Sequence, residues 1–281
     1  MKSISVNTII EAVRSMCMQA ACNLPSDVLE HIEKGRAAEP FPRAQVILDQ
    51  IIENARIGTT ERIPICQDTG VAVFFVNIGN EVTVEGGLLT DAINEGTRQG
   101  YRDGYLRNSM VNDPLFTRKN TGDNTPAVIH TEFTAGDKLE ITFLPKGGGC
   151  ENMSYLAMLK PSDGKEGVIN FVKECIVKSG GNPCPPVVVG IGIGGTADKA
   201  SYLAKKALLR TIGQPNPDSR YAELENELLS AVNGTGVGPQ GLGGKTTALA
   251  IHVEYFPCHI ASMPVAVNLN CHSARKAHII L

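Results

Sequence analysis

The sequence predicts an α+β fold, in which a helical N-terminal region precedes short strands, glycine-rich loops and further helices. Apolar residues recur at helical spacing over about residues 1–60. From Cys66 onward, short apolar runs rich in β-branched residues alternate with helical patterns and glycine clusters. Neither a regular β-α-β alternation nor an internal repeat is present. We therefore expect one domain over residues 1–281.

The helical region contains two amphipathic stretches with a candidate helix start between them. Asp27 followed by Glu30 resembles a capping box that opens a helix reaching about Lys34. The apolar positions of the two stretches are Ile9, Ile10, Val13 and Cys17, then Val46, Ile47, Ile51 and Ile52. Free cysteine is among the most buried residue types, so the cysteines in helical patterns are expected to pack in the core. These are Cys17, Cys22 and Cys175.

The remainder of the chain reads as strands and helices separated by turn-forming residues. The predicted strands are 71–78, 138–144, 187–193, 248–255 and 264–269. The predicted helices are 87–102, 168–177, 196–209 and 221–232. The segment 213–220, with two prolines, is the most linker-like part of the chain. It is too short to mark a domain boundary.

Composition excludes several classes of partner. The formal net charge is −3 and the pI about 6.1, and lysines and arginines are scattered singly, which argues against nucleic acid or an anionic membrane. The N-terminal residues lack the uninterrupted apolar stretch of a signal peptide, and no window approaches the roughly 18 apolar residues of a membrane span. We expect a cytoplasmic protein whose partners are small molecules or proteins. Its thiols then stay reduced, so its cysteines act as core residues or metal ligands.

Three of the eight cysteines stand in loop-forming sequence. They are Cys66 in Ile-Cys-Gln-Asp-Thr-Gly, Cys184 in Asn-Pro-Cys-Pro-Pro and Cys271 in Asn-Leu-Asn-Cys-His. Three thiolates from distant segments can hold a [4Fe–4S] cluster whose fourth iron stays open and acts as a Lewis acid. Cys150, after Lys-Gly-Gly-Gly, is a rival fourth ligand. A fourth thiolate would close the cluster and suit it to electron transfer.

Polar residues near these loops supply further candidates, each with a structural alternative. Gln67 and Asp68 place an amide and a carboxylate beside Cys66, or they form an Asx-turn that closes on Gly70. Arg107, between a helix and a proline turn, suits bidentate binding of a carboxylate, although an isolated arginine is more often a surface residue. His259 lies among apolar residues, where histidine is usually a core side chain.

Glycine-rich loops also resemble nucleotide-binding motifs. Gly190-x-Gly192-x-x-Gly195 follows an apolar run and precedes a helix, as a dinucleotide fingerprint requires. The acidic residue expected about 20 positions later is missing, so an NAD-binding oxidoreductase is a distant alternative. Residues 241–246 resemble the end of a Walker A loop, but Pro239 occupies the position of its first glycine. The Lys146–Gly149 loop fits a tight turn or an anion-binding nest equally well.

Together these motifs resemble the class I, iron–sulfur-dependent fumarate hydratase and L(+)-tartrate dehydratase family, and specifically the α subunit of its two-subunit form. The resemblance runs from about residue 5 to the C-terminus. It rests on Ile65-Cys-Gln-Asp-Thr-Gly70, Lys146-Gly-Gly-Gly149, Cys184-Pro-Pro with Gly192-Ile-Gly-Gly-Thr196, Gly238-Pro-Gln-Gly-Leu-Gly-Gly-Lys245 and Asn270-Cys-His-Ser-Ala-Arg275.

The resemblance implies a [4Fe–4S] cluster on Cys66, Cys184 and Cys271, with Cys150 as a loop residue. It implies that Asp68 and His259 are catalytic and that Gln67, Arg107 and Gly149 bind substrate. The implied reaction is the reversible dehydration of (S)-malate to fumarate, with L(+)-tartrate to oxaloacetate as the alternative. A β subunit would supply the proton-abstracting group, and the assembly would be a heterotetramer.

Overall fold

The computed structural model describes residues 1–281, and these divide into two compact units. Unit 1 comprises Met1–Leu24, Ile57–Gly148 and Arg275–Leu281, and unit 2 comprises Pro25–Arg56 and Gly149–Ala274. No linker composition marks the points where the chain passes between the units, and one domain over residues 1–281 stays a prediction. The linker-like segment 213–220 lies inside unit 2, where its Asn216 is buried.

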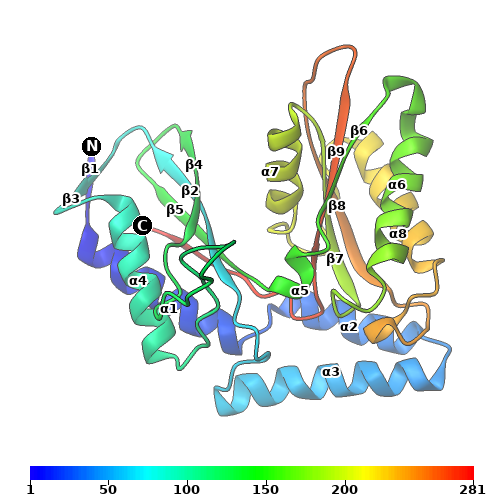
Figure 1. The fold of residues 1–281 in the computed structure, drawn as a ribbon, viewed down its shortest axis with the longest axis horizontal. Helices are drawn as coiled ribbons and strands as arrows, with labels where there is room; N and C mark the ends of the chain where they lie inside the picture. Colours follow the sequence, from blue (N-terminus) through cyan, green and yellow to red (C-terminus); the bar gives the residue numbers. More distant parts are fainter. The chain divides into compact units, whose positions relative to one another are not determined.

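Unit 1 is a four-stranded mixed sheet packed against two helices (Figure 1). The strand order is β10-β5-β2-β4, with β2 parallel to β4 and antiparallel to β5. A separate parallel pair joins β1 to β3. The elements are β1 (Lys2–Ser5), α1 (Val6–Cys22), β2 (Val71–Gly79), β3 (Val82–Glu85), α4 (Leu89–Asp103), β4 (Val128–Thr134), β5 (Leu139–Lys146) and β10 (Ala277–Ile280).

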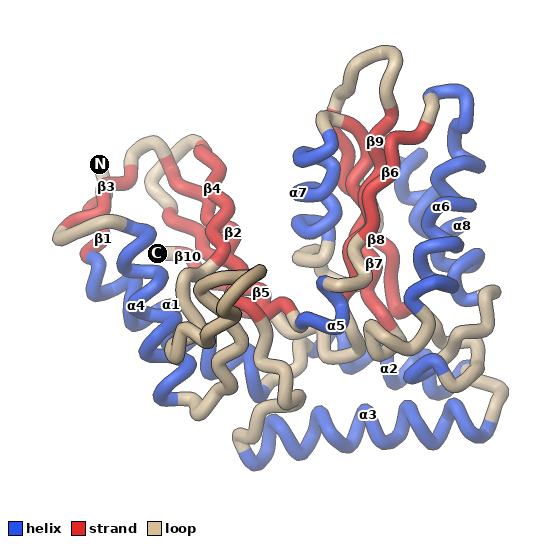
Figure 2. The backbone as a smooth tube through the Cα atoms, in the orientation of Figure 1, coloured by secondary structure: helices blue, strands red, loops and turns tan.

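Unit 2 is a four-stranded mixed sheet of order β6-β9-β7-β8, covered by helices on both faces. Alternation along β9 decides which face each side chain joins: Val265 and Val267 pack with α6 and α8, whereas Ala266 packs with α7. Figures 1 and 2 show α6 and α8 on one side of this sheet and α7 on the other. The elements are α2 (Ser26–Ala38), α3 (Pro42–Glu61, whose last residues belong to unit 1), α5 (Gly148–Glu151, whose first residue does), β6 (Tyr155–Leu159), α6 (Gly164–Ser179), β7 (Val187–Gly194), α7 (Ala197–Ala207), α8 (Ser219–Asn233), β8 (Ala248–Phe256) and β9 (Met263–Asn270).

The glycines that resemble a dinucleotide fingerprint serve helix packing. A Cβ on Gly190 would lie 2.0 Å from the carbonyl oxygen of Ala204, and one on Gly192 would lie 2.0 Å from that of Ala200. Any side chain at these two β7 positions would therefore push α7 off the sheet. Close contact between strand and helix explains this part of the spacing without a bound phosphate.

The α+β class and all the predicted helices and strands are confirmed, with ends shifted by a few residues. The capping box is wrong: α2 begins at Ser26, and Pro25 at the N-cap makes no side-chain bond. Asp27 instead accepts a hydrogen bond from the backbone N–H of Ile212, at 2.8 Å, so a tertiary contact uses its carboxylate. Short or half-exposed elements, namely β1, β3, β4, α5, β6 and β10, were not predicted. None of the helices combines the length and apolarity needed to cross a membrane.

Glu39, between α2 and α3, is a buried carboxylate that fixes the loop before β8. It accepts hydrogen bonds from the backbone N–H of Lys245 (2.9 Å), the N–H of Thr246 (2.8 Å) and the Thr246 hydroxyl (2.7 Å). Burial raises the pKa of Glu39, but these hydrogen bonds lower it by more, so the pKa lies below its ordinary value. The resulting stabilisation is present above the unfolded pKa and is lost as pH falls through the folded pKa.

Replacing Glu39→Gln should therefore lower the free energy of unfolding by about 2 kcal/mol at neutral pH, because charge-assisted bonds to buried donors are lost. The deficit should shrink as pH falls through the folded pKa of Glu39, where the wild-type carboxyl also becomes neutral. Urea unfolding at several pH values measures it, with the exposed Glu53→Gln as control. A deficit that is constant with pH would contradict this account.

Candidate functional site

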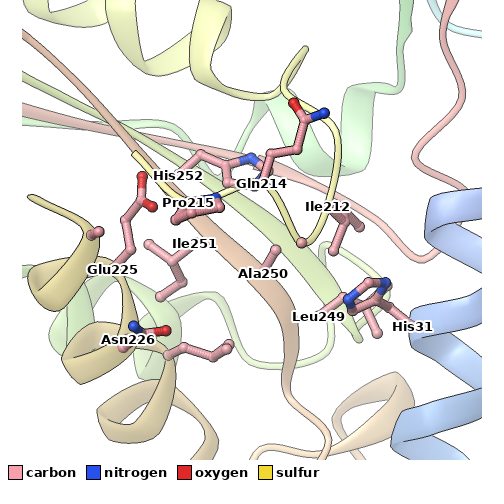
Figure 3. A pocket seen from close by; sticks show the side chains of 13 residues that line it. His31, Ile212, Gln214, Pro215, Glu225, Asn226, Leu249, Ala250, Ile251 and His252 are labelled. Carbon is pink, nitrogen blue, oxygen red and sulfur yellow. The ribbon is translucent and has the colours of Figure 1, made fainter. Parts of the chain in front are cut away.

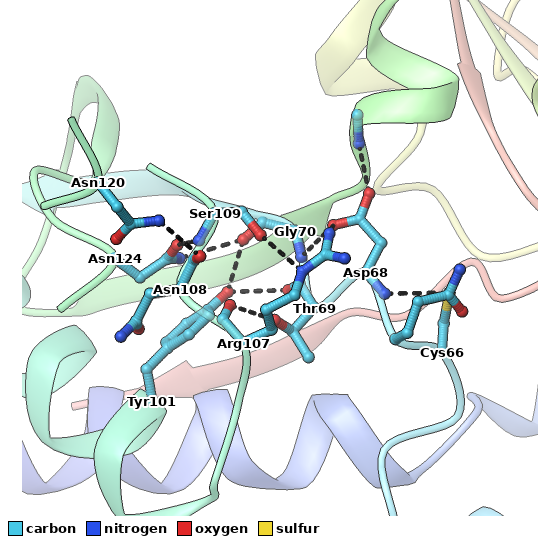
Figure 4. A network of polar contacts seen from close by, with 12 residues as sticks. Cys66, Asp68, Thr69, Gly70, Tyr101, Arg107, Asn108, Ser109, Asn120 and Asn124 are labelled. Atoms are coloured by element: carbon cyan, nitrogen blue, oxygen red, sulfur yellow. Dashed lines mark hydrogen bonds and ion pairs between the residues drawn. The ribbon is translucent and has the colours of Figure 1, made fainter. Parts of the chain in front are cut away.

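The loop that carries Cys66 precedes β2 in unit 1 and is organised around Asp68 (Figure 4). Oδ1 of Asp68 accepts the N–H of Gly70 at 3.1 Å, which confirms the predicted Asx-turn. Oδ2 accepts the N–H of Gly148 at 2.8 Å. The Cys66 sulfur lies 3.4 Å from the backbone nitrogen of Asp68 and 3.5 Å from Oε1 of Gln67. Gln67 and Asp68 thus both contact the sulfur.

Arg107 pairs with the same carboxylate, so the structure brings two of the predicted site residues together. Its Nη2 lies 3.3 Å from Oδ1 of Asp68, and its carbonyl accepts the Thr69 hydroxyl at 2.7 Å. The Arg107 side chain is 56% exposed. One edge of the guanidinium therefore contacts Asp68 while much of the group stays open to a ligand. A fork-shaped cation held in this way suits a substrate carboxylate.

Buried side-chain donors bond to the main chain of the Cys66 loop. The Tyr101 hydroxyl lies 2.9 Å from the carbonyl of Thr69 and 3.0 Å from that of Gly70, and Asn124 donates to the Gly70 carbonyl at 3.1 Å. Burial raises the pKa of Tyr101, so it stays a protonated donor. Gly70 has φ +82°, and a Cβ there would lie 2.7 Å from the backbone nitrogen of Lys146. Sequence reasoning did not identify Tyr101 or Asn124, whose signal is entirely tertiary.

Arg275 was also missed as a site residue, although it ends one of the family-like motifs. Only 2% of it is exposed, and its Nη2 donates to the main-chain carbonyl of Asp68 at 2.8 Å. Its Nε and Nη1 have no acceptor within the protein. A buried guanidinium with open N–H groups favours a nearby anion, since an uncompensated buried charge is costly.

Cys184 and Cys271 lie together at one end of the central strands of the unit 2 sheet. Cys184 precedes β7 and Cys271 follows β9, and because these strands are antiparallel, the two positions meet. The N–H of His272 donates to the Cys184 carbonyl at 3.3 Å, and its Nδ1 lies 3.0 Å from the same oxygen. Cys184 is exposed and has φ +53°, a left-handed conformation that is uncommon for cysteine.

The two residues of the 149–150 loop take different positions beside Cys184. A Cβ on Gly149 would lie 3.1 Å from the carbonyl oxygen of Asn182, so Gly149 lies close against the Cys184 loop. Cys150 is 4% exposed, and its sulfur lies 3.4 Å from the carbonyl oxygen of Pro183. The Cys150 thiol thus packs inward behind the loop that carries Cys184.

His259 lies at the opposite end of the strands of the same sheet, in the turn between β8 and β9. The paired length from Val187 to Gly194 separates the two ends of the strands, and its seven residue steps span about 23 Å at roughly 3.3 Å per residue. Unit 2 therefore does not bring His259 together with Cys184 and Cys271. The side chain is exposed, so its interpretation as a core residue is wrong. It lines a cavity of about 660 Å³ with Cys258 and Lys199.

A smaller cavity of unit 2, about 190 Å³, contains His31, Glu225 and His252 (Figure 3). Glu225 is 6% exposed and accepts hydrogen bonds from Arg210 (2.5 Å) and from the backbone N–H of Val253 (2.8 Å). These bonds hold the carboxylate within the fold.

The three predicted cluster ligands are divided between the units, Cys66 in unit 1 and Cys184 and Cys271 in unit 2. Within neither unit do three or more His, Cys, Asp or Glu side chains form a metal-binding group. None of the eight cysteines forms a disulfide. The donor set is soft thiolate sulfur on loops, which fits an iron–sulfur cluster better than a hard cation.

Comparison with known proteins gives the family. The sequence model described as "Fumarate hydratase (Fumerase)" matches residues 10–280. A Methanocaldococcus jannaschii chain, provisionally named L(+)-tartrate dehydratase subunit alpha, is 44% identical over 275 residues, covering 96% of each chain. The L(+)-tartrate dehydratase subunit alpha of Escherichia coli strain K12 is 34% identical over 285 residues, covering 100% of this chain and 93% of the relative. The resemblance in the motifs is thereby confirmed, and the chain belongs to the class I fumarate hydratase family, which includes L(+)-tartrate dehydratase alpha subunits.

Proposed function

We propose that this chain is the α subunit of a two-subunit hydro-lyase that dehydrates a hydroxy-dicarboxylate at a [4Fe–4S] cluster on Cys66, Cys184 and Cys271. The observation that carries the proposal is that the Cys184 and Cys271 loops meet at one end of the strands β7 and β9, next to Gly149. The Asp68–Arg107 pair beside Cys66 supplies the polar groups that the reaction needs. The three proposed ligands lie on loops of both units.

Two contacts within unit 1 support the proposal. The chain leaves unit 1 after Gly148 and re-enters it at Arg275, and both residues bond to Asp68. Cys271 precedes Arg275 by four residues, a reach of at most about 14 Å between their Cα atoms. Arg275 also presents Nε and Nη1 without protein acceptors, which suits an anionic thiolate-ligated cluster nearby. The residues present therefore fit the group.

The cluster, when bound, would supply a Lewis-acidic iron to the leaving hydroxyl. Arg107 would bind a substrate carboxylate through its open guanidinium edge, and the backbone at Gly149 would orient the substrate. Asp68, held by Gly70 and Gly148, would accept or return a proton at the leaving oxygen. His259 lies at the end of the unit 2 sheet opposite to Cys184 and Cys271, so Asp68 is the better supported of the two catalytic candidates.

The proposed partner is a β subunit that completes the site and supplies the proton-abstracting group, in a heterotetramer. The relatives are named as alpha subunits, which supports a second chain. We propose a cytoplasmic location, since a reducing compartment preserves thiolates and an open iron.

Two substrates fit this chemistry. The sequence motifs favour (S)-malate, whereas the names of the relatives favour L(+)-tartrate, which carries a second hydroxyl. Turnover of both acids by the anaerobically loaded complex with its β subunit tests the proposal. We expect dehydration of one acid at a kcat/KM at least about tenfold above the other, since a pocket that bonds a hydroxyl rejects the analogue lacking it. A loaded complex that dehydrates neither acid would contradict the proposal.

A further inference from the structure

We infer that Gln240 and His272 are positioning residues that fix the distance between Cys184 and Cys271. The inference rests on the proposed cluster site and adds two residues that the motifs leave without a role. All the contacts that carry it lie inside unit 2. They join three segments, namely the Cys184-Pro-Pro loop, the turn at residues 238–241 and the residues that follow β9.

His272 links the two cysteine loops directly. It follows Cys271 in the chain, and its backbone N–H and ring Nδ1 lie 3.3 Å and 3.0 Å from the carbonyl oxygen of Cys184. A bond to the main chain of one ligand from the neighbour of another restricts the spacing of the two sulfurs. Cys271 is itself continuous with the buried end of β9, where Asn270 is 3% exposed. His272 therefore ties the Cys184 loop to this buried end of β9.

Gln240 also bonds to the Cys184 loop. Its backbone N–H donates to the Pro185 carbonyl at 2.8 Å, and its Nε2 donates to the same carbonyl at 3.2 Å. Nε2 also lies 3.1 Å from Nδ1 of His272. With Nδ1 protonated, the ring donates to Cys184; with Nδ1 unprotonated, it accepts from Gln240. In either tautomer the ring ties the residue after Cys271 to a neighbouring loop.

The backbone of this region supports a positioning role. Cys184 and Gln240 have φ values of +53° and +55°, which non-glycine residues seldom adopt. A Cβ on Gly181 would lie 2.9 Å from the Gln240 carbonyl oxygen, and one on Gly241 would lie 2.5 Å from Cα of Gly181. The two loops are thus in backbone contact. Strained conformations persist where the surroundings over-determine them, and they concentrate at functional sites.

The test compares four variants of the full-length chain, each loaded anaerobically with iron and sulfide. His272→Ala and Gln240→Ala should bind iron about 10- to 100-fold more weakly, as loss of a ligand-orienting partner does at other metal sites. They should also change the EPR spectrum of the reduced protein. His272→Asn should restore both, because its amide N–H can replace Nδ1 as donor to Cys184. His31→Ala is the matched control, since its Nδ1 lies 2.8 Å from the Asp27 carbonyl, outside the cysteine loops.

Thermal unfolding of the unloaded chains separates positioning from folding. Equal midpoints with weaker iron binding in the two alanine variants support the inference. Wild-type iron affinity and spectrum in both alanine variants overturn it while leaving the proposed cluster intact. If His272→Asn fails to restore the spectrum, the ring acts by bulk alone and the inference is also overturned. A wild-type chain that binds no iron overturns the proposed function and this inference together.

Discussion

Serine in place of Cys66, Cys184 or Cys271 should abolish the cluster and all dehydratase activity. Serine preserves the size of the side chain, but its hydroxyl is a far poorer ligand for iron than a thiolate. The proposed cluster has three protein ligands, so the loss of one leaves two, and iron content should fall to near background. The effect should be equally severe at all three positions, although they lie on three separate loops of two units.

Cys150→Ser is the matched control for this series. Its sulfur is buried and lies 3.4 Å from the Pro183 carbonyl, so a serine hydroxyl can donate to the same oxygen. We expect this variant to keep the iron content, visible absorption and EPR signal of the wild type. Loss of the cluster in Cys150→Ser as well as in the other three variants would instead support the four-thiolate, electron-transfer alternative. Iron content, absorption and EPR after anaerobic loading distinguish the two patterns.

Asp68→Asn should lower kcat by about 10²- to 10⁴-fold while leaving the cluster in place, as expected for the loss of a general acid–base. The amide keeps an oxygen to accept the Gly70 N–H, but its NH2 group cannot accept the Gly148 N–H, and it has no charge for Arg107 and no transferable proton. The partner guanidinium is more than half exposed, and such pairs contribute only about 0.2–1 kcal/mol to stability. The loss should therefore appear in catalysis and only weakly in unfolding.

Asp113→Asn is a suitable control for that variant. Its carboxylate also accepts backbone N–H bonds, from Leu115, Phe116 and Thr117, and these bonds lower the pKa of Asp113 to about 2. It lies in an exposed turn without an arginine partner, so we expect nearly unchanged turnover. Single-turnover kinetics with the loaded complex measure both variants. Near wild-type kcat in Asp68→Asn would remove Asp68 from the reaction and direct attention to the partner subunit.

Local pattern was sufficient for most of the fold. Strand and helix periodicities located β2, β7, β9 and α4 because they reflect contacts within a few residues. The same reasoning missed β10, whose four residues form a strand by pairing with β5, more than 130 positions earlier. Such pairing depends on register and closure over a long loop, which no local window contains.

The candidate site divides in the same way. By itself, the sequence determined the family and indicated the candidate site residues, because cysteines in polar loops and the Cys-Gln-Asp-Thr-Gly motif are local features. Only the tertiary structure decided that Arg275 bonds to the Asp68 carbonyl and that Gln240 and His272 join two cysteine loops. It also decided that His259 lies at the end of the unit 2 sheet opposite to those loops. The reason is physical: strand direction and packing, which fix these distances, arise from contacts between residues far apart in the chain.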